Sequence, residues 1–208
     1  MKIESLQVGP IRTNCYILYD ETAKVCAVID PGDEGDRIAA AVEKSGCALQ
    51  YVLLTHGHFD HFTGLAALLG HYDVPVYIQK KDAMDHEDGS EYSIRFPRLD
   101  EAHQRWYSDG DELQLGNLTI RVMETPGHSQ GSVCLVVEDV IFSGDTLFRS
   151  SCGRTDLEGG DYRAILESLG RLGRLEGDYH VYPGHDRDTT LAEERRFNPY
   201  LRHGMGLE

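Results

Sequence analysis

A short motif in the first half of the chain combines residue types that bind metal ions. Thr55-His56-Gly57-His58-Phe59-Asp60-His61 contains three histidines and one aspartate within six consecutive residues. The motif directly follows Tyr51-Val52-Leu53-Leu54, an apolar run typical of a buried strand. Where that strand ends, His56 and His58 can point to the same side, and imidazole and carboxylate groups suit zinc, iron or manganese. The motif therefore predicts a metal site at the end of this strand.

Three later motifs each place one more ligand-type side chain beside a glycine, after a predicted strand. They are Pro126-Gly127-His128-Ser129, Ser143-Gly144-Asp145-Thr146 and Pro183-Gly184-His185. Glycine lets the backbone turn sharply, and loops on a rigid scaffold commonly gather such side chains into one site. Spacing alone leaves two interpretations open, namely three ordinary turns or three further ligands of the same site.

The surrounding residues predict strands in each half of the chain, with helices after them. In the first half, strands are expected at Lys2–Val8, Cys15–Tyr19, Val25–Ile29 and Val74–Ile78, a turn at Asp30-Pro31-Gly32-Asp33, and helices at Gly35–Lys44 and Phe62–Leu69. In the second half, we expect the hairpins Glu112–Leu115 with Leu118–Met123 and Val133–Val137 with Val140–Phe142, a strand at Tyr179–Tyr182, and helices after Asp161 and at Leu191–Phe197. Two packed sheets with outer helices would bury these strands. Residues 81–106 are polar and mixed, which favours a surface insertion.

Size and charge limit what the protein can be. Its 208 residues suffice for one domain, over 1–208, with a substantial core. The 35 acidic residues outnumber the 20 Lys and Arg and give a net charge of −15. Because nucleic-acid phosphates require a basic face, this charge disfavours nucleic acid as a partner. No apolar run approaches the roughly 20 residues that span a bilayer, so no membrane partner is expected.

The cysteines indicate the compartment. There are five of them, an odd number, widely spaced and without a CxxC pair. This pattern favours a reducing environment without a disulfide framework. The N-terminal residues also lack the pattern of a secretion signal, so we expect a cytoplasmic protein. The sequence indicates no oligomeric state.

Taken in order, the four motifs resemble those of the metallo-β-lactamase superfamily. The series T-H-x-H-x-D-H, PGHS, GDT and PGH runs from Thr55 to His185, and the opening segments Val8-Gly9-Pro10 and Thr13-Asn14-Cys15-Tyr16 are also typical. The resemblance implies an α/β (α+β) fold, a four-layer αββα sandwich with the metal site at one edge of its two sheets. It implies a first metal held by His56, His58 and His128, a second held by Asp60, His61 and His185, and Asp145 bridging the two. The expected cofactors are two Zn²⁺ ions, with iron or manganese as alternatives.

One segment indicates which branch of the superfamily this chain resembles. Gly144-Asp145-Thr146-Leu147-Phe148 with Ser151-Cys152-Gly153-Arg154 is similar to glyoxalase II, the hydroxyacylglutathione hydrolase. The family carries a lysine that contacts the anionic end of glutathione where this chain has Arg154, so Arg154 and the neighbouring Cys152 are candidate substrate-binding residues. Only 23 residues follow His185, so we expect a short hydrolase without the separate C-terminal glutathione-binding domain.

The expected reaction is hydrolysis of a small-molecule thioester, with a glutathione thioester as the implied substrate. Two metals would supply a hydroxide nucleophile at neutral pH. Asp60 would orient that nucleophile and receive its proton. A thiol leaving group has an unperturbed pKa near 8.5 and needs little help from a general acid, whereas an amide needs far more.

Several alternatives stay open at this stage. Cys152–Asp156 and the tail segment Glu193–Pro199 also resemble the persulfide dioxygenases, which use one iron. Lactone or phosphodiester hydrolysis and a non-catalytic metal-binding role are further hypotheses. For the two candidate substrate-binding residues, the simpler interpretations are a surface ion pair for Arg154 and a packed small side chain for Cys152.

Overall fold

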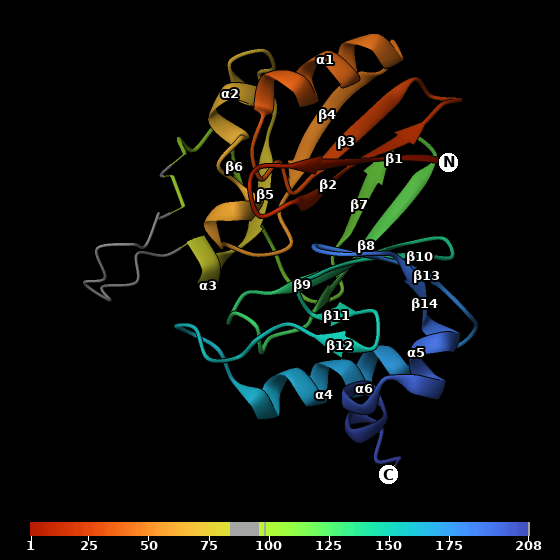
Figure 1. The fold of residues 1–208 in the computed structure, drawn as a ribbon. Helices are drawn as coiled ribbons and strands as arrows, with labels where there is room; N and C mark the ends of the chain where they lie inside the picture. The colour runs from red at the N-terminus through yellow and green to blue at the C-terminus, as the bar shows by residue number, and fades with distance from the viewer. Residues whose placement is uncertain (84–95, 98, 208) are drawn as a thin grey trace.

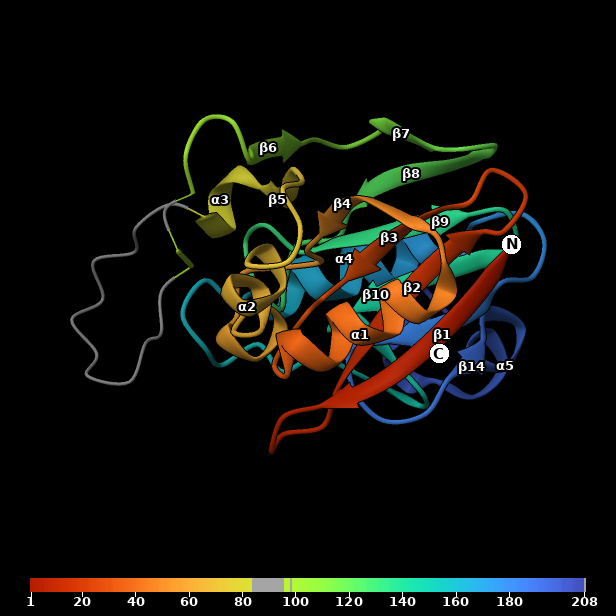
Figure 2. The same ribbon diagram turned by 90° about the horizontal axis from the view of Figure 1, so that it is seen from above.

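Two six-stranded sheets face each other, and helices cover the outer side of each (Figures 1 and 2). The computed structural model describes residues 1–83, 96–97 and 99–207. From top to bottom in Figure 1, the layers are helices, sheet, sheet and helices. This arrangement confirms the predicted αββα sandwich. Among the described residues, no helix has the length and apolar character needed to cross a membrane.

The first sheet takes its strands in chain order. They are β1 (Lys2–Val8), β2 (Thr13–Asp20), β3 (Val25–Ile29), β4 (Ala48–Leu53), β5 (Val76–Gln79) and β6 (Gln104–Tyr107). The first three strands pair antiparallel, and the pairs from β3 to β6 are parallel. Its helical segments are α1 (Gly35–Ser45), the 3₁₀ turn η1 (Phe59–His61), α2 (Leu65–Leu69) and α3 (Lys80–Ala83). Parallel pairing requires crossovers, which α1 and α2 supply.

The second sheet has the order β14-β13-β10-β9-β8-β7. Its strands are β7 (Glu112–Leu115), β8 (Leu118–Glu124), β9 (Val133–Val137), β10 (Val140–Gly144), β13 (His180–Pro183) and β14 (Thr189–Thr190). A small ribbon, β11 (Leu147–Phe148) with β12 (Ser151–Cys152), lies beneath it. The outer helices are α4 (Tyr162–Gly173), α5 (Leu191–Phe197) and α6 (Pro199–Gly204). Asp161 caps α4 as predicted, since its side chain accepts a hydrogen bond from Ala164 N.

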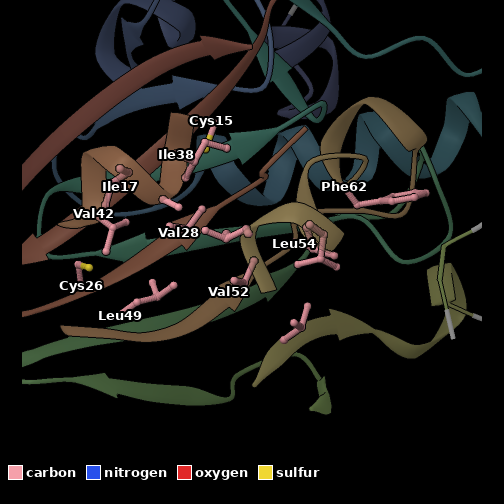
Figure 3. Packing of buried hydrophobic residues seen from close by; sticks show 14 of the residues in the cluster. Cys15, Ile17, Cys26, Val28, Ile38, Val42, Leu49, Val52, Leu54 and Phe62 are labelled. Carbon is pink, nitrogen blue, oxygen red and sulfur yellow. The ribbon is translucent and has the colours of Figure 1, made fainter. Parts of the chain in front are cut away.

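Three apolar clusters hold the four layers together. β2 shows how the sequence builds two of them, because successive side chains of a strand point to opposite faces. Ile17 packs toward α1 and α2, whereas Tyr16 and Leu18 pack between the sheets. Figure 3 shows the first cluster, where Ile38 and Val42 of α1 meet the sheet. The third cluster lies between the second sheet and α4–α6. Packing on both faces makes the strand ends rigid supports for loops.

The structure departs from the sequence-based expectation at three places. The expected helix Phe62–Leu69 is two shorter elements, η1 and α2. The expected surface insertion, residues 81–106, begins in α3 and ends in β6, which joins the first sheet as its edge strand. Residues 84–95 and 98 of this segment lie outside the described part. Helix α6 was not expected, although Asn198 caps its start and Pro199 is its first residue, which are ordinary helix-start signals.

Candidate metal centre

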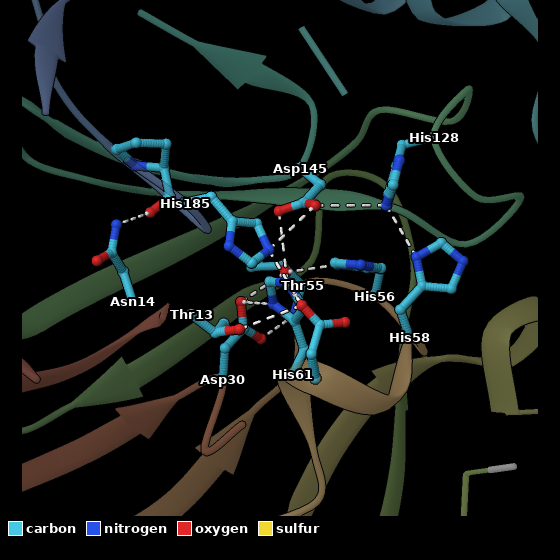
Figure 4. Close-up of polar contacts among 12 residues, drawn as sticks. Thr13, Asn14, Asp30, Thr55, His56, His58, His61, His128, Asp145 and His185 are labelled. Carbon is cyan, nitrogen blue, oxygen red and sulfur yellow. Dashed lines mark hydrogen bonds and ion pairs between the residues drawn. The ribbon is translucent and has the colours of Figure 1, made fainter. Parts of the chain in front are cut away.

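The structure brings all seven predicted ligand residues together. They come from the loop after β4, from η1, and from the ends of β8, β10 and β13: His56, His58, Asp60, His61, His128, Asp145 and His185. Their ligand atoms form three overlapping groups, and within each group they lie within 4.8 Å of one another. Figure 4 shows the side chains converging from segments far apart in the sequence. The turns after the strands are therefore parts of one site.

Three imidazoles form the first group. His58 Nδ1 and His128 Nε2 lie 2.8 Å apart, and the His56 ring centroid is 4.8 Å from each of their centroids. Burial, followed by the nearby His128 and His61, lowers the pKa of His58 to about 4. Burial and the neighbouring histidines also lower the pKa of His56 well below its usual value. His56 and His58 are therefore neutral at pH 7, the form that binds metals.

The second group combines one carboxylate with two imidazoles. Asp60 Oδ2 lies 3.0 Å from His185 Nε2 and 3.6 Å from His61 Nε2. Burial opposes charge on all three residues, but nearby groups of opposite charge, including Asp30 and Asp145, outweigh it. The pKa of Asp60 is lowered by the hydrogen bond with His185 and by the charge of His61, while nearby carboxylates raise the pKa of His61 and His185. This group favours positive charge, whether carried by protons or by a cation.

Asp145 lies between the two groups. Its Oδ1 is 3.4 Å from His61 Nε2, and its Oδ2 is 3.5 Å from His128 Nε2 and 3.6 Å from His185 Nε2. A Cβ atom on Gly184 would lie 2.2 Å from Asp145 Oδ1, so only glycine fits beside this carboxylate. One carboxylate thus reaches both groups, as a bridging ligand must.

Unsatisfied buried atoms at the centre indicate whether its donor set fits metal ions. Within the described residues, three buried side-chain atoms lack a hydrogen-bond partner: His56 Nε2, His61 Nε2 and Asp145 Oδ1. All three belong to the candidate ligands, and leaving such atoms unpaired costs about 1–3 kcal/mol each. Nitrogen and oxygen donors of this kind suit zinc, iron and manganese. The residues therefore fit a metal-binding role.

A second layer of hydrogen bonds orients the rings. Asp30 accepts from Thr55 N at 2.8 Å and from Thr55 Oγ1 at 2.7 Å, and its Oδ2 lies 2.9 Å from His61 Nδ1. The Thr13 hydroxyl donates to Asp60 Oδ2 at 3.1 Å. Such partners fix which ring nitrogen faces a metal. From its sequence context, Asp30 was expected only as part of a turn, although it directly follows the strand Val25–Ile29, and His56, His128 and His185 likewise follow strands.

The side chains of the two candidate substrate-binding residues, Arg154 and Cys152, make contacts away from the seven candidate ligands. The Arg154 guanidinium is exposed and pairs with Asp156 through contacts of 2.6 and 2.8 Å. Its backbone carbonyl, not its side chain, reaches the centre, because Arg154 O lies 2.8 Å from His128 Nδ1. Cys152 packs against the third apolar cluster, and burial raises the pKa of its thiol to about 11. A role for either side chain in substrate binding stays a prediction.

A pocket opens beside the second group. It reaches Asp60 and Thr13 and is bordered by Ile11 and Phe59. Both apolar side chains are well exposed, Ile11 at 50% and Phe59 at 39%. Of the seven candidate ligands, this pocket reaches Asp60 alone.

Comparison with known proteins identifies the family. A sequence profile of the metallo-beta-lactamase superfamily matches residues 8–185. The chain belongs to the metallo-β-lactamase superfamily. Members named for hydrolase activity are among its relatives: hydroxyacylglutathione hydrolase GloC of Haemophilus influenzae is 34% identical, over 97% of this chain and 98% of that protein. The chain is thus a metallo-hydrolase of this superfamily.

Solved structures show the same architecture at full length. The B3 metallo-beta-lactamase BLEG-1 superposes with a TM-score of 0.85 at 32% identity, covering 96% of this chain and 99% of its own. TTHA1623, solved in a di-iron-bound form, superposes with a TM-score of 0.80 at 35% identity, covering 95% and 99%. The superfamily fold is therefore shared over nearly the whole chain, and a similar protein holds two metals that are not zinc.

Proposed function

We propose that this superfamily member hydrolyses a small-molecule thioester of the hydroxyacylglutathione type at a centre of two zinc ions. One observation supports the proposal above the others: Asp145 lies within 3.6 Å of a histidine nitrogen from each ligand group. A shared carboxylate links two sites into one centre. The likeness to GloC over both whole chains supports the thioester as substrate class.

The proposed ligands divide as the two groups do. His56, His58 and His128 would hold one ion, Asp60, His61 and His185 the other, and Asp145 both. Bound there, two divalent ions would lower the pKa of a water molecule toward 7 and polarise a substrate carbonyl.

The chain's own residues would prepare the reaction. Asp60 is ionised at neutral pH, because hydrogen bonding to His185 and the charge of His61 outweigh the effect of burial on its pKa. Thr13 fixes the direction of its carboxylate through Oδ2. An ionised carboxylate held in this way can accept a hydrogen bond from a water molecule and orient it. We further propose that Asp60 receives the proton of that water. The exposed Phe59 and Ile11 would contact the apolar part of the acyl group.

The chemistry of the leaving group is the reason that we propose a thioester rather than an amide as the substrate. The titratable groups identified at the centre are the seven candidate ligands and Asp30, and the proposed metals would occupy ligand atoms of the seven. Asp30 accepts hydrogen bonds from Thr55 and lies 2.9 Å from His61 Nδ1. A leaving thiolate, with an unperturbed pKa near 8.5, departs without a proton donor. An amine leaving group would need one.

Turnover of S-lactoylglutathione by zinc-loaded and iron-loaded protein, with metal quantified in the same samples, tests the proposal. We expect turnover with two zinc ions per chain. Asp60→Asn should lower kcat by about 10²–10³-fold while the first group keeps its metal. As a control, Asp36→Asn removes an exposed carboxylate that pairs with His71, and it should leave kcat unchanged. Unchanged turnover by Asp60→Asn with full metal content would refute the role of Asp60.

A second candidate, β-lactam hydrolysis, is favoured by the likeness to BLEG-1. The same zinc-loaded protein can be assayed with a chromogenic cephalosporin. Turnover of the cephalosporin without turnover of any thioester would replace the proposal by this candidate.

One iron per chain together with oxygen consumption in the presence of glutathione persulfide would instead support the dioxygenase alternative.

A further inference from the structure

Asp82 is buried beside the metal centre, in the segment that the sequence suggested was a surface insertion. It lies in α3 and is 9% exposed. Its carboxylate accepts three hydrogen bonds: from Gly57 N at 2.9 Å, from Ser129 Oγ at 2.6 Å and from Gly131 N at 2.5 Å. None of these partners lies near Asp82 in the sequence, so the carboxylate joins distant loops.

The three donors belong to the two loops that carry the first ligand group. Gly57 stands between His56 and His58, on the loop after β4 of the first sheet. Ser129 follows His128, on the loop between β8 and β9 of the second sheet. The three imidazoles of the group are therefore supplied by two sheets, and one carboxylate connects their loops directly.

The glycines in these loops show how closely Asp82 fits. A Cβ atom on Gly57 would lie 2.4 Å from the Asp82 carbonyl oxygen, and one on Gly131 would lie 2.6 Å from Asp82 Oδ1. Neither position has room for a side chain while Asp82 stays in place. The loops thus approach α3 as far as backbone atoms allow, and the position of each loop depends on the same side chain.

We propose that Asp82 is a positioning residue that sets the distance between the His56–His58 loop and the His128 loop, and thereby the metal affinity of the first group. The inference rests on the proposed metal-binding role of these histidines, but not on the substrate. His58 Nδ1 and His128 Nε2 lie 2.8 Å apart across this junction. Without the carboxylate, the two loops would keep their strands and the backbone hydrogen bond from Val133 N to Thr55 O, but would lose the three hydrogen bonds that Asp82 accepts from them.

Asp82→Asn tests the proposal with little change in shape. An amide offers one acceptor oxygen, so its NH₂ group must face Gly131 N or Gly57 N, and donor would meet donor. We expect the zinc dissociation constant of the first group to rise by about 10–100-fold, the usual effect of losing such an outer partner. Chelator competition on folded holoprotein measures the constant, and the absorption bands of a cobalt-substituted sample report changed ligand geometry.

Asp20→Asn is a matched control. Asp20 also accepts backbone hydrogen bonds that join a loop of the first sheet to one of the second, from Thr22 N and Ala23 N at 2.9 and 3.0 Å and from Asn117 N at 2.7 Å. It lies at the end of β2 away from Thr13 and the centre. Its replacement should lower the unfolding midpoint as Asp82→Asn does, but leave zinc affinity and the cobalt spectrum unchanged.

Ser129→Ala removes one of the three donors and gives a second test if Asp82→Asn does not fold. It should weaken zinc binding less than Asp82→Asn, and it should add little in the Asp82→Asn background, because both act through one network. Zinc affinity and cobalt spectra equal to wild type in both variants, or in Ser129→Ala alone if the other is unfolded, would overturn the proposal. Weakened zinc binding in a protein that hydrolyses no thioester would overturn the proposed substrate only.

Discussion

The two ligand groups of the centre differ in charge and in exposure. His56 and His58 of the first group are held neutral by burial and by neighbouring imidazoles. The second group includes the ionised Asp60, and its His185 and Asp60 side chains keep 20% and 16% of their surface exposed. We infer that the first group selects a metal by its imidazole donors, whereas the second attracts a cation by charge and faces the substrate. The predictions below test that division.

The largest effect is expected from Asp145→Ala, because this carboxylate serves both groups. Its removal should lower the occupancy of both metals and reduce kcat/KM by about 10³-fold. Metal quantification and thioester turnover on the same sample measure the two losses. If only the second group lost its metal, Asp145 would belong to that group alone and the bridging role would be wrong.

Asp30→Asn should act mainly on the second group, since Asp30 reaches the first group only through Thr55, whose Oγ1 lies 3.1 Å from His56 Nδ1. Asp30 contacts His61 Nδ1 at 2.9 Å and so orients a ring of the second group. Zinc affinity of that group should fall about 10–100-fold, as is typical when the partner of a ligand histidine is lost. The first group should bind zinc more nearly as in wild type. Titration with zinc under chelator competition resolves the two affinities, and equal weakening of both would contradict the division.

Arg154→Ala tests the substrate-binding prediction from sequence. If the guanidinium contacts an anionic thiol carrier, KM for S-lactoylglutathione should rise by about tenfold, or 1.4 kcal/mol, at unchanged kcat. Asp156→Ala is the paired variant, because it frees Arg154 from its surface ion pair and should lower KM instead. Unchanged KM in both variants would contradict a role of the Arg154 side chain in substrate binding. Arg154 would then contribute only its surface ion pair with Asp156 and its backbone contact to His128.

The smallest effect concerns the pH dependence of the metal-free protein. His58 has a folded-state pKa of about 4, below the usual 6.5, so the unfolded chain binds its proton first as pH falls. Stability from this residue is therefore lost between pH 6.5 and about 4. His58→Gln should flatten that part of the stability profile, measured by urea unfolding. A profile as steep as wild type would show that His58 is not held neutral.

The sequence identified the side chains that converge, because most of them follow a strand that its own pattern identifies; their role as metal ligands stays a prediction. His56 stands where a predicted strand of the first sheet ends, and His128 and His185 stand where strands of the second sheet end. Packing of the two sheets brings these ends to the same edge of the sandwich. Asp30 fitted the same rule but was interpreted as a turn, since a lone aspartate before proline and glycine carries no ligand pattern. Asp82 could not be found this way. Its role depends on α3 folding against two loops from different sheets, and nothing local in residues 80–83 specifies that contact.

The central claim is that two ligand groups share Asp145 and act as one centre of two metals. Stepwise zinc titration of metal-free protein, with S-lactoylglutathione turnover followed at each addition, tests it most directly. If the two groups form one centre, turnover should rise with the second equivalent of zinc and then stay constant at two per chain. Full turnover with one equivalent, or with none, would contradict it.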